Sequence, residues 1–142
     1  MMYLPHQRHS SIMRDRESLN QKEPWPFSFA LRPFCSAKPA VVGRYLHVVY
    51  LELLRRGYDV YVGKINSFEV DFVAQNSKGT RYYQAALSVR DEKTLERELR
   101  PLMAIRDHYP KMILTLDDDP EAQYDGIRRI NARDWLLGLT DN

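Results

Sequence analysis

The amino-acid sequence predicts an α/β (α+β) fold in which helices flank a mixed β-sheet. Three observations predict it. An apolar stripe at helical spacing is followed by three strand-like segments, a second amphipathic helix comes next, and a short continuous apolar run follows that helix. The order of elements is therefore αβββαβ, with a small strand and a helix appended. Three consecutive strands, a helix and a fourth strand imply a mixed sheet with helices packed on its faces.

Length and composition indicate one globular domain. The 142 residues are 44% apolar and 28% charged, which are ordinary fractions for a soluble protein. No apolar run is long enough to span a membrane, and the first residues lack the apolar core of a secretory signal. We therefore expect a cytoplasmic protein with no membrane partner. The single cysteine, Cys35, cannot form an internal disulfide, and we interpret it as an incidental thiol.

Residues 1–42 differ in amino-acid composition from residues 43–142. The first segment holds five of the eight prolines and six Lys and Arg residues against three acids, whereas the second holds fifteen basic residues against sixteen acids. The basic, proline-containing first segment is predicted to be largely disordered, and residues 43–142 are predicted to form the domain. Alternating apolar residues between Trp25 and Phe34 leave a second interpretation open, in which this stretch adds an edge strand or docks on the domain.

The first helix is predicted from an apolar stripe that would face the core. The stripe consists of Leu46, Val49, Tyr50, Leu53 and Leu54. Two arginines and then Gly57 supply a cationic end and a stop signal for this helix. Residues 58–62 alternate as a strand, and residues 63–67 are predicted to form a turn.

A β-hairpin follows, and it carries the main candidate residues. Its first strand alternates over residues 68–74, so that Asp71 lies on the polar face. The apolar face consists of Phe68, Val70, Phe72 and Ala74, and the other face of Glu69, Asp71 and Val73. A polar turn over residues 76–79 leads to a second strand, residues 80–88, on which Gln84 and Ala86 point to the same face.

The second helix is predicted to begin after the hairpin, with Asp91 or Ser88 as its N-cap. Its buried stripe consists of Leu95, Leu99, Leu102 and Met103, and its solvated residues are Glu92, Glu96, Arg97 and Arg100. Pro101 predicts a kink or a break inside this helix, which is expected to end before residue 109.

The C-terminal elements are shorter. Residues 111–116 form a continuous apolar run that is typical of a buried central strand. The acidic residues 117–119 that follow are interpreted as a solvated turn, because they lack the ligand spacing of a calcium loop. A strand over residues 126–130 and a helix over residues 132–137, capped by Asn131, complete the chain.

The order αβββαβ resembles the core of the restriction-endonuclease-like fold, the PD-(D/E)xK nuclease superfamily. The resemblance implies that Asp71 stands at the position of a magnesium-binding acid and Gln84 at that of the following Glu or Gln. Ala86 stands where these nucleases carry a lysine, and Leu46 stands where an acid of the first helix is expected. Asp71 and Gln84 are therefore predicted to be vestigial nuclease-site positions and only weak metal candidates. We expect Asp71 to be a structural acid, bound to a backbone amide or to Arg81.

A closer resemblance covers residues 43–138. It rests on the segments LELLRRGYDVYVGK, EVDFVA, YYQAALS, DEKTLERELRPL, YPKMILTLD and GIRRINARDWLLG, in this order and spacing. They resemble the domain of unknown function at the C-terminus of prokaryotic AAA-type ATP-binding proteins, which implies a restriction-endonuclease-like module whose partner is an ATPase domain. The chain contains no GxxxxGK[ST] phosphate loop, so ATP binding is not expected in it. Its first helix also reads YLH where family members tend to read LEN.

Together these observations predict a non-catalytic accessory or interaction module that uses no cofactor. Its partner would be another protein or the missing ATPase domain, and the chain would be a truncated family member. The alternative is a nucleic-acid-binding module or a weakly active metal-dependent nuclease. Residues 43–142 have a net charge near zero, however, whereas nucleic-acid binders usually carry a broad positive footprint.

The remaining polar and aromatic candidates have simpler interpretations. His47 and His108 are interpreted as solvated or capping histidines rather than catalytic bases. The arginine pairs at residues 55–56 and 128–129 fit a cationic helix end and an exposed strand face. Trp135 is expected to dock the last helix on the core or to belong to a surface that faced the missing ATPase domain.

Overall fold

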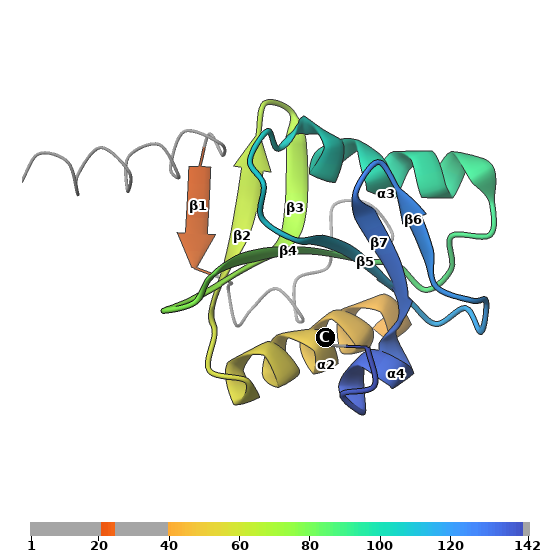
Figure 1. Ribbon diagram of the computed structural model, residues 1–142, viewed down its shortest axis with the longest axis horizontal. Helices are drawn as coiled ribbons and strands as arrows, with labels where there is room; N and C mark the ends of the chain where they lie inside the picture. The colour runs from red at the N-terminus through yellow and green to blue at the C-terminus, as the bar shows by residue number, and fades with distance from the viewer. Residues whose placement is uncertain (1–20, 25–39, 141–142) are drawn as a thin grey trace, which may run out of the picture.

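The computed structural model describes residues 21–24 and 40–140, which form one sheet with helices on both of its faces (Figure 1). The elements are β1 (Gln21–Pro24), α2 (Ala40–Arg55), β2 (Asp59–Ile65), β3 (Phe68–Asn76), β4 (Gly79–Ala85), α3 (Glu92–Ala104), β5 (Lys111–Thr115), β6 (Ala122–Tyr124), β7 (Ile127–Asn131) and α4 (Ala132–Leu136). The strand order is β1-β2-β3-β4-β5-β7-β6. Strands β1 to β4 pair antiparallel, β5 lies parallel between β4 and β7, and β6 pairs antiparallel with β7.

The α/β class with a mixed sheet is confirmed. The order αβββαβ is present as α2, β2, β3, β4, α3 and β5. Helices α2 and α4 cover one face of the sheet, and α3 covers the other (Figure 1). None of the helices in the described part of the chain is long and apolar enough to cross a membrane.

Two short parts of residues 1–42 belong to the fold, namely strand β1 and the first residues of helix α2. Strand β1 lies inside the stretch predicted to be disordered and pairs antiparallel with β2 at the edge of the sheet. Helix α2 begins at Ala40, three residues before Gly43, the predicted start of the domain. The predicted disorder of residues 1–20 and 25–39, and the apolar stretch from Trp25 to Phe34 with its neighbour Cys35, lie outside the described residues.

Helix α2 buries the predicted stripe with one correction. Leu46, Val49 and Leu53 are buried, together with Tyr45, but Leu54 is 42% exposed. Successive helix residues are about 100° apart, so the residue after Leu53 turns away from the sheet. The predicted stop is confirmed, because Gly57 has a φ of 80°, which glycine adopts without strain.

The three central strands differ from the predicted ones in length. Strand β2 continues to Ile65, which leaves a turn of only two residues, Asn66 and Ser67, before β3. Strand β4 ends at Ala85 rather than at residue 88. Backbone hydrogen bonds to the neighbouring strands determine where each strand ends, and the local sequence pattern does not reveal these hydrogen bonds.

A β-bulge interrupts β3 at Asp71. Tyr61 pairs with Val73 but Gly63 pairs with Val70, so two residues of β3 stand opposite one residue of β2. As a result Val70 packs in the same cluster as Val73, on the α3 face, while Phe72 packs on the α2 face. The strict alternation predicted for residues 68–74 is therefore wrong at this point.

Helix α3 begins and packs largely as predicted. The Asp91 carboxylate accepts a hydrogen bond from the Thr94 backbone N–H at 2.9 Å, which confirms it as the N-cap. The helix continues through Pro101 to Ala104 without the predicted break. Proline removes one backbone hydrogen bond there, and the buried Leu102 next to it keeps this turn packed on the core. Met103, which is predicted to belong to the buried stripe, is 49% exposed.

The C-terminal part adds a hairpin that the sequence pattern did not predict. Strand β5 is central, as predicted, and β7 lies one residue beyond the predicted range. Strand β6 spans only three residues, which is too short to show a period of two. Asp125 and Gly126, with φ values of 48° and 84°, form the turn between β6 and β7.

Candidate functional site

Asp71 and Gln84, which the resemblance predicts to be vestigial nuclease positions, lie together at the bulge. The Asp71 backbone N–H donates a hydrogen bond to Gln84 Oε1 at 3.2 Å, and the Ala85 backbone N–H donates one to Asp71 Oδ2 at 3.0 Å. Regular pairing of β3 with β4 ends at Phe72 and Tyr83, just before these residues. The two side chains therefore join β3 to β4 beyond the end of the regular ladder. We call this pair of contacts the Asp71–Gln84 latch.

The latch is buried, and residue 86, where the resemblance leads one to expect a lysine, is an alanine. Asp71 is 4% exposed and Gln84 is 6% exposed. Ala86 packs in the apolar cluster on the α3 face, and its backbone N–H donates to the Leu114 carbonyl. Asp71 thus binds a backbone amide, which is one of the two partners expected for a structural acid.

Helix α2 presents a tyrosine to this region rather than an acid. Leu46 is buried in the core, and its neighbour Tyr45 is 8% exposed. Burial, followed by the charges of Asp71 and Asp117, raises the pKa of the Tyr45 hydroxyl. A buried neutral phenol therefore lies close to two carboxylates, and the sequence patterns did not indicate this position.

Glu52 is the acidic residue of α2, and it lies elsewhere. Its carboxylate accepts hydrogen bonds from Arg55 and Arg56 at 2.7 Å. The hydrogen bond from Arg55 and the positive charges of both arginines lower the pKa of Glu52 to about 2. Glu52 and the two arginines thus form an ion-pair group at the C-terminal end of α2.

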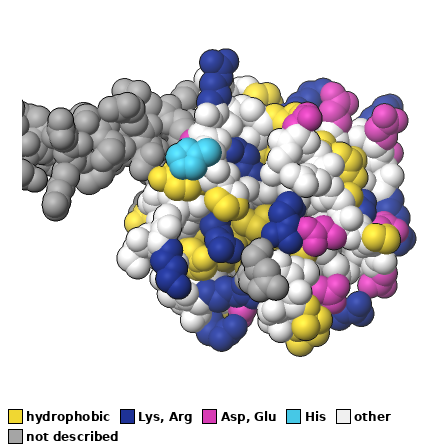
Figure 2. Space-filling model, in the orientation of Figure 1, with side chains coloured by type: hydrophobic (Ala, Val, Ile, Leu, Met, Phe, Trp, Pro, Cys, Tyr) yellow, Lys and Arg dark blue, Asp and Glu magenta, His cyan; other side chains and the backbone are white. Residues whose placement is uncertain are grey.

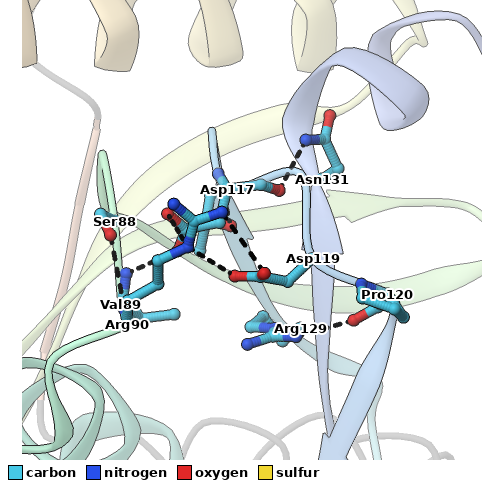
Figure 3. A network of polar contacts seen from close by, with 9 residues as sticks. Ser88, Val89, Arg90, Asp117, Asp119, Pro120, Arg129 and Asn131 are labelled. Atoms are coloured by element: carbon cyan, nitrogen blue, oxygen red, sulfur yellow. Dashed lines mark hydrogen bonds and ion pairs between the residues drawn. The ribbon is translucent and has the colours of Figure 1, made fainter.

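A second polar cluster joins the carboxyl ends of the parallel strands β4, β5 and β7 (Figure 3). Asp117 follows β5, and its Oδ2 accepts a hydrogen bond from the Val89 backbone N–H at 2.8 Å. Arg90 Nε lies 2.9 Å from Asp119 Oδ2 and 3.7 Å from Asp117 Oδ1. Asp117 is only 7% exposed, so the interpretation of residues 117–119 as a solvated turn is wrong for their first member.

Asn131 connects β7 and α4 to this cluster. Its Nδ2 donates to the Asp117 carbonyl at 2.7 Å, while its Oδ1 accepts from the Arg133 backbone N–H at 2.8 Å and so caps α4. Arg129 donates to the Pro120 carbonyl at 2.7 Å (Figure 3). The cluster thus ties the ends of three strands and the start of a helix with charged and polar contacts.

The remaining sequence candidates occupy separate places. Arg128 pairs with Glu121 at 2.6 Å, and the partly buried His47 lies 6.2 Å from Tyr50, measured between ring centroids. His108 is exposed and stacks on the Tyr109 ring. Across residues 21–24 and 40–140, no group of three His, Cys, Asp or Glu side chains is arranged to hold a metal ion.

Replacing Asn131 by alanine is expected to lower the free energy of unfolding by about 1–3 kcal/mol. The variant loses the N-cap of α4, and the Asp117 carbonyl loses the hydrogen bond that Asn131 Nδ2 donates to it. Asn131→Ser keeps an N-cap oxygen but cannot reach the carbonyl, so it should lie between wild type and Asn131→Ala in urea denaturation. Equal stability of all three proteins would contradict the dual role of this side chain.

Comparison with known proteins identifies one relative. The chain is 41% identical over 91 residues to an uncharacterized protein of Haemophilus influenzae, and the match covers 64% of this chain and 22% of that protein. The chain therefore spans about a fifth of the length of this relative. No protein-family model matches the sequence, and no solved structure matches it. The comparison establishes partial homology and leaves the activity of both proteins open.

The sequence predicted that Asp71 and Gln84 are neighbours but did not indicate three features of the site. The proximity of Asp71 and Gln84 followed from the hairpin, since facing positions on paired strands are neighbours. Tyr45 was missed because it borders the apolar stripe of α2. For Asp117 and the second role of Asn131 one signal was available. Both residues directly follow predicted strands, and polar groups gather at the carboxyl ends of strands that pair in parallel.

Proposed function

We propose that this chain is a non-catalytic interaction module with a restriction-endonuclease-like core, and that it works as one domain of a larger ATP-binding assembly. The observation that carries the proposal is the Asp71–Gln84 latch. Both side chains that would serve magnesium in a nuclease use an oxygen to bind a backbone N–H group. Their positions are thus explained by the needs of the sheet.

The chemistry of the surrounding positions supports the same proposal. Magnesium prefers several hard oxygen ligands, and a nuclease also needs a cation or base to orient the attacking water. Ala86 supplies neither, and Leu46 places an isobutyl group where a helix acid would stand. Tyr45 remains protonated, because its pKa is raised by burial and by the two neighbouring carboxylates.

The relative from Haemophilus influenzae supports a multidomain setting. The matched region makes up 22% of that protein, so a related module occurs there next to much additional sequence. The resemblance of residues 43–138 to the C-terminal domain of AAA-type ATP-binding proteins identifies an ATPase domain as the proposed neighbour. In this proposal the module contributes contacts, and its neighbour contributes the nucleotide chemistry.

The pairing of arginines favours protein contacts over the nucleic-acid alternative. Arg90 pairs with Asp119, Arg100 with Glu96, and Arg133 with Asp118, so acids offset much of the positive charge at the surface. A phosphate backbone would have to compete with these carboxylates. Binding of DNA is accordingly expected to be no tighter than that of an unrelated protein of equal charge, as fluorescence anisotropy at several salt concentrations would show.

A cleavage assay tests the proposal directly. Purified protein is expected to leave labelled DNA and RNA intact in the presence of Mg²⁺ or Mn²⁺. The variants Asp71→Ala and Gln84→Ala, prepared in the same way and checked for folding by circular dichroism, control for contaminating nucleases. Cleavage by the wild-type protein that both folded variants lose would overturn the proposal and support the nuclease alternative.

A further inference from the structure

Helix α2 carries a line of exposed apolar side chains on the side away from the sheet. Val41 is 55% exposed, Val48 45%, Leu51 48% and Leu54 42%. At about 100° per residue these positions fall within an arc of roughly 140°. They are half of the eight large exposed hydrophobic side chains in the described residues, and the others are spread over α3 and the C-terminal loops. We call this face, together with Arg44 and Arg55, the docking face.

The spacing of the docking face suits a second helix. Val41, Val48 and Leu51 are separated by seven and three residues, which is the spacing of the seam between two packed helices. Single exposed apolar residues are ordinary on protein surfaces, whereas an aligned set on one helix is typical of an interface. The opposite side of α2, with Leu46, Val49 and Leu53, is already occupied by the core.

The charge of the docking face indicates the kind of partner. Arg44 is exposed and forms no ion pair with any residue that the structure describes, and the side chain of Arg55 is 70% exposed. The nearest acid, Glu52, is 10% exposed and is held by Arg55 and Arg56. In Figure 2 hydrophobic and basic side chains lie next to one another in the lower left part of the molecule, and most acidic side chains lie to the right. A partner with carboxylates beside an apolar stripe complements this face.

We propose that the docking face binds an acidic amphipathic helix that belongs to another part of the larger protein. This inference rests on the proposed function and names its contact surface. The relative from Haemophilus influenzae has most of its length outside the matched region, which provides sequence for such a helix. A second copy of the chain is a poorer occupant, since two docking faces would bring Arg44 and Arg55 of both copies together.

A pair of labelled peptides tests the proposal on the full chain. Both peptides carry leucine at the a and d positions of each heptad, and they differ in having glutamate or lysine at the flanking positions. The glutamate peptide is expected to bind in fluorescence anisotropy, at least ten-fold more tightly than the lysine peptide. Leu51→Asp should weaken its binding at least ten-fold, and Arg44→Glu should reverse the preference between the two peptides.

The controls distinguish the possible failures. Met103→Asp alters an exposed apolar residue of similar accessibility on α3 and should leave binding of the glutamate peptide unchanged. Three outcomes would overturn the proposal. They are absence of binding, equal binding of both peptides, and binding that is unchanged in Leu51→Asp and Arg44→Glu. A dimer in analytical ultracentrifugation that Leu51→Asp dissociates would overturn it in favour of a second copy. None of these measurements involves nuclease activity. The docking face can therefore fail its test while the cleavage assay still supports the proposed function, and the reverse.

Discussion

Replacing Trp135 by alanine is expected to lower the free energy of unfolding by about 3–5 kcal/mol, the largest effect of any substitution considered. Trp135 is fully buried between α4 and the sheet. Its ring lies 5.6 Å from the Tyr83 ring, between centroids, and the Arg56 guanidinium lies 4.4 Å above it. Arg56 also donates a hydrogen bond to the Trp135 carbonyl. Alanine would leave a cavity that joins α2, α4 and β4, and short helices such as α4 depend on packing of this kind.

Urea denaturation followed by circular dichroism measures this effect. Leu137→Ala is the matched control, because Leu137 belongs to the same C-terminal segment but is 67% exposed, and it should change stability by less than about 0.5 kcal/mol. A loss below about 1 kcal/mol for Trp135→Ala would mean that α4 does not close the core. The sequence interpretation of Trp135 as a docking residue would then fail as well.

Replacing Asp71 by alanine is expected to cost about 2–4 kcal/mol of stability. The variant removes a charge-assisted hydrogen bond and leaves the buried Ala85 N–H without an acceptor. Asp71→Asn retains an oxygen that can accept this hydrogen bond and should therefore lose less. The ladder offers no substitute for this hydrogen bond, because regular pairing of β3 and β4 ends at Phe72 and Tyr83.

The change in stability caused by Asp71→Ala distinguishes a structural role of Asp71 from a catalytic one. Acids retained for catalysis often leave stability unchanged, or reduce it, because active sites hold charges in unfavourable surroundings. An Asp71→Ala protein as stable as wild type in urea denaturation would therefore contradict the latch. Glu69→Ala is a suitable control, since Glu69 is an exposed acid on the same strand and should have little effect.

Much of the architecture follows from local patterns. The stripe around Val49 predicted α2, and the carboxylate of Asp91 and the amide of Asn131 predicted the starts of α3 and α4. The apolar run of residues 111–116 predicted a central strand, and β5 lies inside the sheet, between β4 and β7. These features depend on residues within one or two turns of each other, so a single sequence contains the information for them.

The candidate site depends on contacts between distant segments. The positions of Asp71 and Gln84 on a hairpin were sufficient to predict that they are neighbours. That Asp71 lies at a bulge depends on its pairing with β2, and the burial of Asp117 depends on the Val89 amide, which lies 28 residues away in the chain. The exposure of Leu54 and Met103 likewise depends on which sides of α2 and α3 the sheet covers.

The periodicity of hydrophobic residues was thus enough to establish the class of fold and the order of its elements. The use of Asp71 and Gln84 as a latch, the three-strand cluster around Asp117 and the apolar docking face of α2 required the folded chain. The reason is physical. A hydrogen bond or an exposed surface is created by whichever segments approach each other, and that approach is a property of the assembled sheet and helices.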